Sequence, residues 1–288
     1  MKRYFYALLI IIFAFPSYSE PLFWSAKKGQ LELVIFGSVH VGDERFYPLP
    51  NTVTDYLLSS DGLIVETDIQ NPGAVQYPPL RIRSQALLNE TQQNELVGIA
   101  KLLNLNAQEL LSLPPWATAL QVQMRQFEYL GYSADKGVDI QLLRQAGLNQ
   151  IPVLSLETFQ FQIDLLTKQA EGGKELLIST IEEFDKTEQA THCLIDSWLK
   201  GDIKHLEKFA KLAAISPEFE DQFIYQRNKD WAMKLDKGIT SQSNKGKYLV
   251  VVGTLHLVGR DNLISLLKQR GFETKQLSNS ETSLCKFD

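Results

Sequence analysis

The chain has 288 residues, 44% of them hydrophobic, and its 29 basic and 34 acidic residues give a net charge of −5. Such a chain can bury a substantial core, in one large domain or in two small ones. The two signs of charge are well mixed along the sequence and form no basic stripe, which argues against a nucleic acid as a partner.

Residues 1–19 have the pattern of a secretory signal peptide. Lys2 and Arg3 precede an apolar run of about a dozen residues, and the small residues Ser17 and Ser19 suit a cleavage after Ser19. The alternative is a membrane anchor, but this run is short for a span of roughly 20 residues. We therefore expect an exported protein, periplasmic or secreted, whose mature domain is residues 20–288 and keeps no stable membrane anchor.

The chain has two cysteines, Cys193 and Cys285. In an exported protein two cysteines can form a disulfide, and the alternative is a pair of buried thiols. Two cysteines cannot build a site in which thiolates hold a metal.

Short apolar segments predict the strands of a sheet. Residues 21–37 read as a β-hairpin whose turn is "KKGQ". The segments 62–66, 151–157 and 248–253 are apolar throughout instead of alternating, which is typical of parallel strands covered on both faces. Residues 272–278 suit a last strand at the edge of the sheet.

Helical patterns separate these strands. Residues 137–147 and 260–271 each end at a glycine, and Asp139 is placed to cap the first of them. The stretches 80–135 and 159–235 are mostly helical, and Pro114 with Pro115 interrupts the first. The alternation predicts an α/β fold with a central mixed, largely parallel sheet, helices on both faces and a helical cap layer.

An imidazole or a carboxylate follows each of four predicted strands. "VIFG" leads to His40, "LIV" to Glu66, "VLSL" to Glu157 and "VVVG" to His256. Ligands of open α/β sheets bind outside the carboxyl ends of the strands, so parallel strands would bring these four side chains to one edge. Both histidines stand in a G-x-x-H motif, whose glycine permits a sharp turn.

Two histidines and a glutamate suit a catalytic divalent metal. His40 and His256 would be ligands, and Glu66 a ligand or the general base that activates a metal-bound water. Because thiolates are absent, zinc, manganese or cobalt is expected rather than copper(I). Arg227 and Asn228, in "IYQRNKDWA", could act at the same site, with the arginine paired to Glu66 or Glu157 or stabilising an oxyanion; the alternative is an ordinary exposed helix charge.

The motifs together resemble one protein family. "FGSVHVG", "LIVETD", "VLSLETFQFQ", "WLKGD", "YQRNKDWA" and "VVVGTLHLVGRDNLISLLKQRGF" occur in the order seen in the TraB/GumN family. That family is similar to Tiki, an animal membrane protease that cleaves Wnt, and is more distantly related to erythromycin esterases and haem-binding ChaN-like proteins. The resemblance implies an α/β fold of the erythromycin esterase/ChaN type and metal-dependent peptide hydrolysis.

The resemblance also places functional residues on this chain. His40 and His256 match the two family histidines, Glu66 the acid after the second strand, and Glu157 the acid of the L-E-T motif. Arg227 and Asn228 match the R-N pair.

Three functions stay open at this point. The first is an exported metal-dependent hydrolase, most simply a peptidase, in which Glu157 orients a ligand and Arg227 stabilises charge. The second is an esterase-like hydrolase without metal, in which His40 is the general base on water. The third is a protein that binds haem or a small ligand in the same cleft without catalysis.

Overall fold

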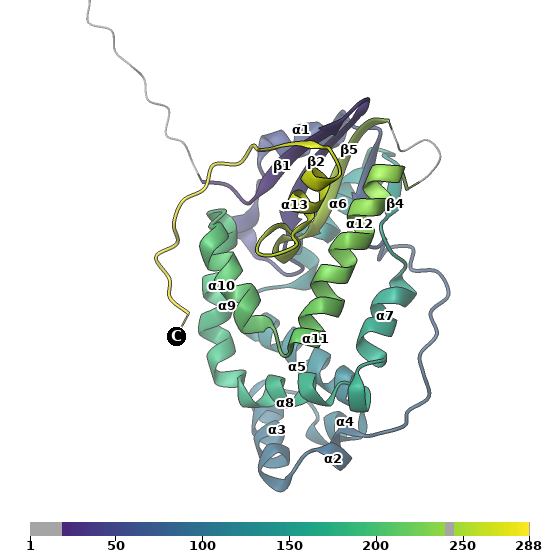
Figure 1. Ribbon diagram of the computed structural model, residues 1–288. Helices are drawn as coiled ribbons and strands as arrows, with labels where there is room; N and C mark the ends of the chain where they lie inside the picture. The colour runs from purple at the N-terminus through teal and green to yellow at the C-terminus, as the bar shows by residue number, and fades with distance from the viewer. Residues whose placement is uncertain (1–18, 240–244, 288) are drawn as a thin grey trace, which may run out of the picture.

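The computed structural model describes residues 19–239 and 245–287. A six-stranded sheet lies at the centre of the protein, in the order β4-β3-β5-β2-β1-β6 (Figure 1). Its strands are β1 (Phe23–Lys28), β2 (Leu31–Ser38), β3 (Gly62–Val65), β4 (Val153–Ser155), β5 (Gly246–Gly253) and β6 (Glu273–Gln276). Strands β4, β3, β5 and β2 are parallel, whereas β1 is antiparallel to both of its neighbours.

The hairpin of β1 and β2 confirms the turn expected at "KKGQ". Gly29 has φ of +58°, a left-handed conformation that glycine adopts without steric cost. The predicted strand at 151–157 is shorter in the structure, where β4 spans Val153–Ser155 and is only half-buried. It is shorter and less buried because β4 is an edge strand that pairs on one side only.

Both faces of the sheet are covered by helices, as the continuous apolar strands predicted. Along β5, Leu249 and Val251 pack on one face, and Val250 and Val252 pack on the other. One face is covered by α1 (Asn51–Leu58), α6 (Val138–Leu148) and α9 (Phe184–Leu199), and the other by α12 (Gln226–Lys237) and α13 (Leu263–Gln269). Figure 1 shows α12 and α13 in front of the sheet, with α6 behind it.

A helical layer with a core of its own lies below the sheet in Figure 1. It contains α2 (Ser84–Leu87), α3 (Glu90–Leu102), α4 (Ala107–Ser112), α5 (Pro115–Tyr129) and α8 (Lys174–Glu182). As predicted, the proline pair separates two helices, because α4 ends at Ser112 and α5 begins at Pro115. The remaining helices of more than one turn are α7 (Phe159–Thr167), α10 (Ile203–Ala213) and α11 (Pro217–Glu220). The α/β class with a cap layer is confirmed.

A disulfide joins Cys193 to Cys285, with 5.4 Å between the Cα atoms, so the bridge is formed and not the alternative of two buried thiols. It fastens the C-terminal tail to α9. The tail also contacts the start of α10, where the Ser283 backbone N–H donates to Asp202 Oδ2 at 2.7 Å. The bridge closes a loop of 92 residues and therefore restricts the unfolded chain.

Removing this bridge is expected to lower the free energy of unfolding by about 2–4 kcal/mol. The measurement is urea unfolding of the Cys193→Ala, Cys285→Ala double variant beside the parent chain. A reductant should bring the parent to the stability of the variant and leave the variant unchanged. A difference below about 1 kcal/mol would contradict the expectation.

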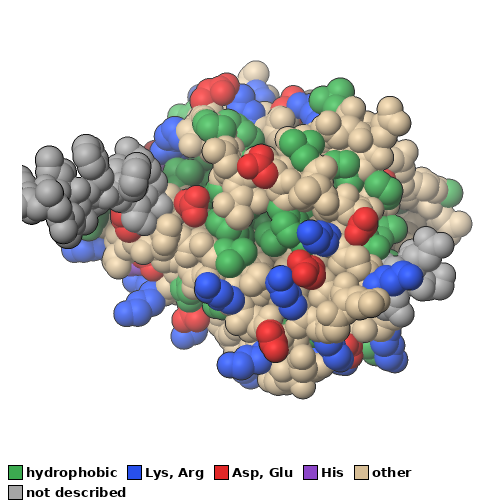
Figure 2. All heavy atoms as spheres, turned by 90° about the horizontal axis from the view of Figure 1, so that it is seen from above, with side chains coloured by type: hydrophobic (Ala, Val, Ile, Leu, Met, Phe, Trp, Pro, Cys, Tyr) green, Lys and Arg blue, Asp and Glu red, His purple; other side chains and the backbone are tan. Residues whose placement is uncertain are grey.

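The predicted signal peptide falls on residues 1–18 and Ser19, so nearly all of it lies outside the described residues. Within the described ranges, none of the helices is long and apolar enough to cross a membrane. On the face shown in Figure 2, acidic and basic side chains alternate with hydrophobic ones, and neither sign of charge dominates.

Candidate active site

The two G-x-x-H motifs lie side by side at the carboxyl ends of β2 and β5. Their parallel register pairs Gly37 with Val252 and Ser38 with Gly253. A Cβ atom on Gly37 would lie 2.8 Å from the Thr254 hydroxyl oxygen, so only glycine permits this close packing. The carbonyl of Gly37 also accepts a hydrogen bond of 2.8 Å from the indole of Trp198 on α9.

Side chains from three strand ends meet around Gly253. A Cβ atom on Gly253 would lie 3.3 Å from Glu66 Oε1, 3.5 Å from His256 Cδ2 and 4.0 Å from His40 Nε2. The three residues expected to hold a metal are therefore brought together at one edge of the sheet.

Arg227 lies between two glutamates at this edge. Its Nη2 donates to Glu66 Oε2 at 2.5 Å and to Glu157 Oε1 at 2.7 Å, and its Nε donates to Glu157 Oε2 at 3.2 Å. The side chains of Arg227, Glu66 and Glu157 are only 9%, 8% and 4% exposed. The sequence predicted that Arg227 could pair with Glu66 or with Glu157. In the structure it pairs with both, and the three side chains form a buried triad, Glu66–Arg227–Glu157.

The backbone brings the two carboxylates together. Glu66 follows β3 and Glu157 lies just beyond β4, and the Glu157 N–H donates to the Glu66 carbonyl at 2.9 Å. Arg227 is the second residue of α12, which follows a π-helical turn at Asp221–Tyr225. The Phe223 carbonyl in this turn accepts from Arg227 Nη1 at 3.0 Å. π-Helical turns are frequent at functional sites.

Neutral donors complete the hydrogen bonding of the carboxylates. The Gly253 N–H donates to Glu66 Oε1 at 2.7 Å, and the Trp231 indole donates to Glu157 Oε2 at 3.1 Å. The amide of Gln162 donates to Glu157 Oε1 at 3.0 Å. These donors hold both carboxylates in one orientation.

Glu66 is ionised at neutral pH. Burial acts to raise its pKa, but the opposing charge of Arg227 and the Gly253 N–H lower the pKa to about 2. Glu66 therefore carries a negative charge beside the Arg227 guanidinium.

His256 is a buried neutral imidazole. Burial and the neighbouring Arg227 lower its pKa to about 3, although Glu66 acts in the other direction. Its Nδ1 lies 2.7 Å from Asn228 Oδ1, and the amide nitrogen of Asn228 donates to the Asp261 carbonyl. Because Asn228 thus offers an acceptor, Nδ1 carries the proton and Nε2 accepts from Arg227 Nη1 at 3.3 Å.

His40 has the opposite environment. Its side chain is 69% exposed, and its Nδ1 lies 3.0 Å from Asp139 Oδ2. The other oxygen of Asp139 accepts from the Ser38 hydroxyl at 2.7 Å. The Asp139 carboxylate raises the pKa of His40 to about 9, so this imidazole is cationic at neutral pH while that of His256 is not.

The family model described as the TraB/PrgY/gumN family matches residues 22–276. This chain belongs to the TraB/PrgY/gumN family. The match spans every site residue named so far, from Ser38 to Asp261, and ends before Cys285.

Several curated proteins are similar to this TraB/PrgY/gumN member. "Uncharacterized protein YbaP" of Escherichia coli (strain K12) is 28% identical over 253 residues, 87% of this chain and 93% of that protein. The YbaP of Shigella flexneri is 28% identical over 236 residues, 81% of this chain and 87% of that protein. A "Metalloprotease TIKI homolog" of Amphimedon queenslandica is 30% identical over 76 residues, 26% of this chain and 15% of that protein. No solved structure matches the chain significantly.

The arrangement in this TraB/PrgY/gumN chain does not fit a metal held by His40, Glu66 and His256. In the described ranges, no three His, Cys, Asp or Glu side chains are disposed to hold a metal ion. The physical reason is Arg227, whose guanidinium contacts both Glu66 and the His256 Nε2 where a metal would have to lie. A resident zinc, manganese or cobalt ion stays a prediction from the sequence, and it would require Arg227 to move.

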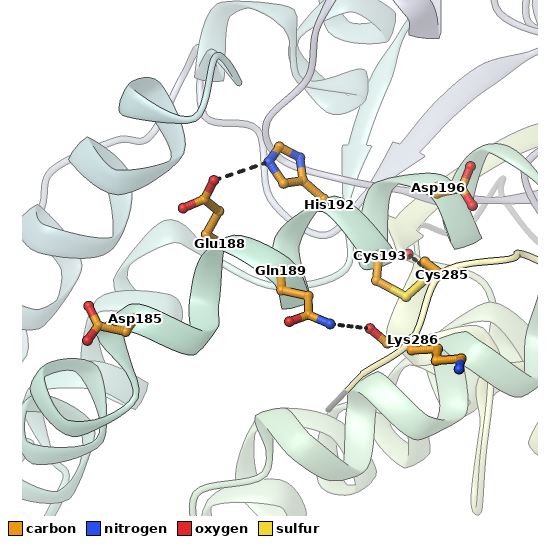
Figure 3. A pocket seen from close by; sticks show the side chains of 8 residues that line it. All are labelled: Asp185, Glu188, Gln189, His192, Cys193, Asp196, Cys285 and Lys286. Atoms are coloured by element: carbon orange, nitrogen blue, oxygen red, sulfur yellow. Dashed lines mark hydrogen bonds and ion pairs between the residues drawn. A yellow bond between two sulfur atoms is a disulfide. The ribbon is translucent and has the colours of Figure 1, made fainter.

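A cavity of about 550 Å³ opens onto this centre, between α7 and α12. Glu157 and Arg227 line it, so a bound molecule there would lie against the buried triad. Another cavity, of about 680 Å³, lies beside the disulfide and is shown in Figure 3. Its wall contains His192 and Glu188 on α9 but none of the predicted site residues.

Three residues of this site did not follow from the sequence. Asp139 was expected to cap a helix, but that expectation is wrong: α6 begins at Val138 after Gly137, and the Asp139 carboxylate binds Ser38 and His40 instead. Gln162 and Trp231 were not singled out. Trp231 could have been found, because it lies four residues after Arg227 and therefore on the same face of the predicted helix.

Proposed function

We propose that this TraB/PrgY/gumN member is a hydrolase that cleaves amide bonds in peptides. The observation that supports this most is the meeting of two imidazoles of opposite protonation state with the Glu66–Arg227–Glu157 triad around Gly253. Environments that drive the pKa values of neighbouring groups apart are typical of acid–base catalysis. The name of the partial relative, "Metalloprotease TIKI homolog", is the reason for choosing peptides as substrates.

In this proposal His40 moves the protons. Asp139 accepts a hydrogen bond from Nδ1 of His40 and thereby orients the ring. The neutral form of His40 then takes a proton from water at Nε2. The resulting hydroxide adds to the amide carbon, and the imidazolium then returns a proton to the leaving nitrogen. Arg227, a cation in the cavity wall, stabilises the negative charge that develops on the amide oxygen. Glu66 and Glu157 hold Arg227, and Asn228 holds His256.

The function is tested by incubating the purified protein with a mixed peptide library and identifying cleavage sites by mass spectrometry. We expect new amino and carboxyl termini that the His40→Ala protein does not produce. Failure of the parent chain to cleave any peptide in the library would overturn the proposal.

Activity is expected to rise with pH up to about 9. Asp139 raises the pKa of His40, so the free base needed to accept a proton from water appears only as the pH approaches that value. A pH–rate profile of peptide cleavage provides the measurement. A rate that is flat from pH 6 to pH 9 would contradict a role for His40 as the base.

Chelation is expected to leave peptide cleavage largely intact, because Arg227 supplies the positive charge that the sequence assigned to a metal. The rate is compared before and after treatment with EDTA and dialysis. A loss of activity that manganese, cobalt or zinc restores would contradict this expectation. That result would instead support the metal-dependent hydrolase expected from the sequence.

We also propose that the protein is exported. The disulfide supports this, since such bonds persist in oxidising compartments and are rare in the cytosol. The interspersed charges in Figure 2 support a peptide or small-molecule partner over a nucleic acid.

A further inference from the structure

We propose that the cavity between α7 and α12 binds a cationic group of the substrate, either a Lys or Arg side chain or a free amino terminus. This inference rests on the proposed function, because it takes the cavity whose wall includes Glu157 and Arg227 as the place where the substrate binds. Beyond peptide cleavage, it specifies that the site selects substrates with a cationic group.

The cavity wall has an excess of negative charge. Three carboxylates line the cavity, Glu157, Asp164 and Asp230, against the two cations Lys168 and Arg227. The charge of Arg227 is offset by its ion pairs with Glu157 and with the neighbouring Glu66. The carboxylates of the wall therefore outnumber its cations, which favours a cationic group of the substrate over an anionic one.

Asp164 and Asp230 are available to a ligand because their present partners are weak. Asp164 Oδ2 pairs with Lys168 at 2.8 Å and its Oδ1 accepts from the Gln160 amide at 2.8 Å, whereas Asp230 pairs with Lys234 at 2.6 Å. Each pair joins residues four apart in the chain, the first along α7 and its C-terminal cap and the second along α12. The Lys168 side chain is 73% exposed. Ion pairs of this kind contribute little free energy, so a substrate cation can replace the lysine at small cost.

The α7 wall also offers an aromatic face. Phe161 is 42% exposed although it is a large apolar residue, and it lines the cavity one turn before Asp164 and Leu165. A ring face beside a carboxylate is a favourable setting for an ammonium or guanidinium group. Leu165 can pack against the methylene stem of a long cationic side chain. In Figure 1, α7 and α12 run beside each other, so a substrate between them would contact both walls.

The test measures binding rather than turnover, so that it does not depend on cleavage. Four peptides of one sequence are titrated against the His40→Ala protein by calorimetry. Three have blocked termini and differ in one central residue, Lys, Gln or Glu; the fourth has the Gln residue and a free amino terminus. We expect the Lys peptide, the free-amino peptide or both to bind at least about fivefold more tightly than the blocked Gln peptide, which corresponds to roughly 1 kcal/mol. Which of the two binds tighter identifies the source of the cation.

Variants that remove one carboxylate charge show which residues cause the preference for a cationic peptide. Asp164→Asn and Asp230→Asn should each reduce the preference by about half or more, whereas Asp185→Asn should not change it. Asp185 lines the cavity beside the disulfide, so its variant removes the same charge at a distance (Figure 3). Equal binding of all four peptides, no measurable binding, or a preference that survives both Asn variants would overturn this inference. The proposed function is judged separately, by whether the parent chain cleaves any peptide.

Discussion

Replacing Arg227 by methionine is expected to lower the free energy of unfolding by about 3–5 kcal/mol and to abolish peptide cleavage. The change removes the one cation between two carboxylates that are 8% and 4% exposed. Breaking a buried ion pair by removing one partner leaves an uncompensated charge, and that is the costly step. Urea unfolding and a cleavage assay on the same preparation measure the two effects.

Two further variants serve as controls for Arg227. Arg227→Lys keeps the charge but loses the planar fork that binds both oxygens of Glu157, so we expect an intermediate loss of stability and activity. The triple variant Arg227→Met, Glu66→Gln, Glu157→Gln removes all three charges and should recover most of the stability without recovering cleavage. If Arg227→Met unfolds within about 1 kcal/mol of the parent, the triad does not stabilise the fold as described.

His40→Ala is expected to reduce cleavage by about 10²–10⁴-fold, the usual contribution of a group that transfers protons. Its effect on the free energy of unfolding should stay below about 1 kcal/mol above pH 9, because the side chain is 69% exposed and has lost its charge there. At neutral pH the loss should be larger, because the imidazolium then pairs with Asp139. The rate at saturating substrate and the urea midpoint are measured on the same protein.

His256→Ala is the matched comparison for His40→Ala. His256 stands in the same G-x-x-H motif, but its side chain is 4% exposed and both ring nitrogens are hydrogen-bonded. Its removal should therefore lower the free energy of unfolding by about 2–4 kcal/mol. If the two variants instead show equal losses of stability, the contrast between the two histidines is wrong.

Much of the fold could be predicted because apolar strands and their polar ends are local features of the sequence. Continuous apolar runs identified β3 and β5, and the parallel direction of the strands implied that His40, Glu66, Glu157 and His256 share one edge. The number of cysteines and the expected export made a disulfide one of two alternatives, and the structure decides between them.

The environment of each site residue could not be predicted in the same way. His40 and His256 have the same local motif, yet one is exposed beside Asp139 and the other is buried beneath Arg227. That difference depends on how α6 and α12 pack against the sheet, which no pattern within the two motifs records. For the same reason the sequence did not predict that the Arg227 guanidinium would lie between Glu66 and His256.

The central place of β5 in the sheet has a consequence for the order in which the protein is completed. β5 lies between β2 and β3, and it is made after both of them and after every helix that precedes residue 246. Without it, β1 can pair with β2 and β3 with β4, but no strand pairing among the described residues joins the two pairs. His256, the Gly253 N–H and the contact that aligns Glu66 all come with that last central strand. A ribosome-bound or truncated chain that stops before it therefore has no assembled centre, so the activity proposed here would begin only once the chain has been synthesised through His256.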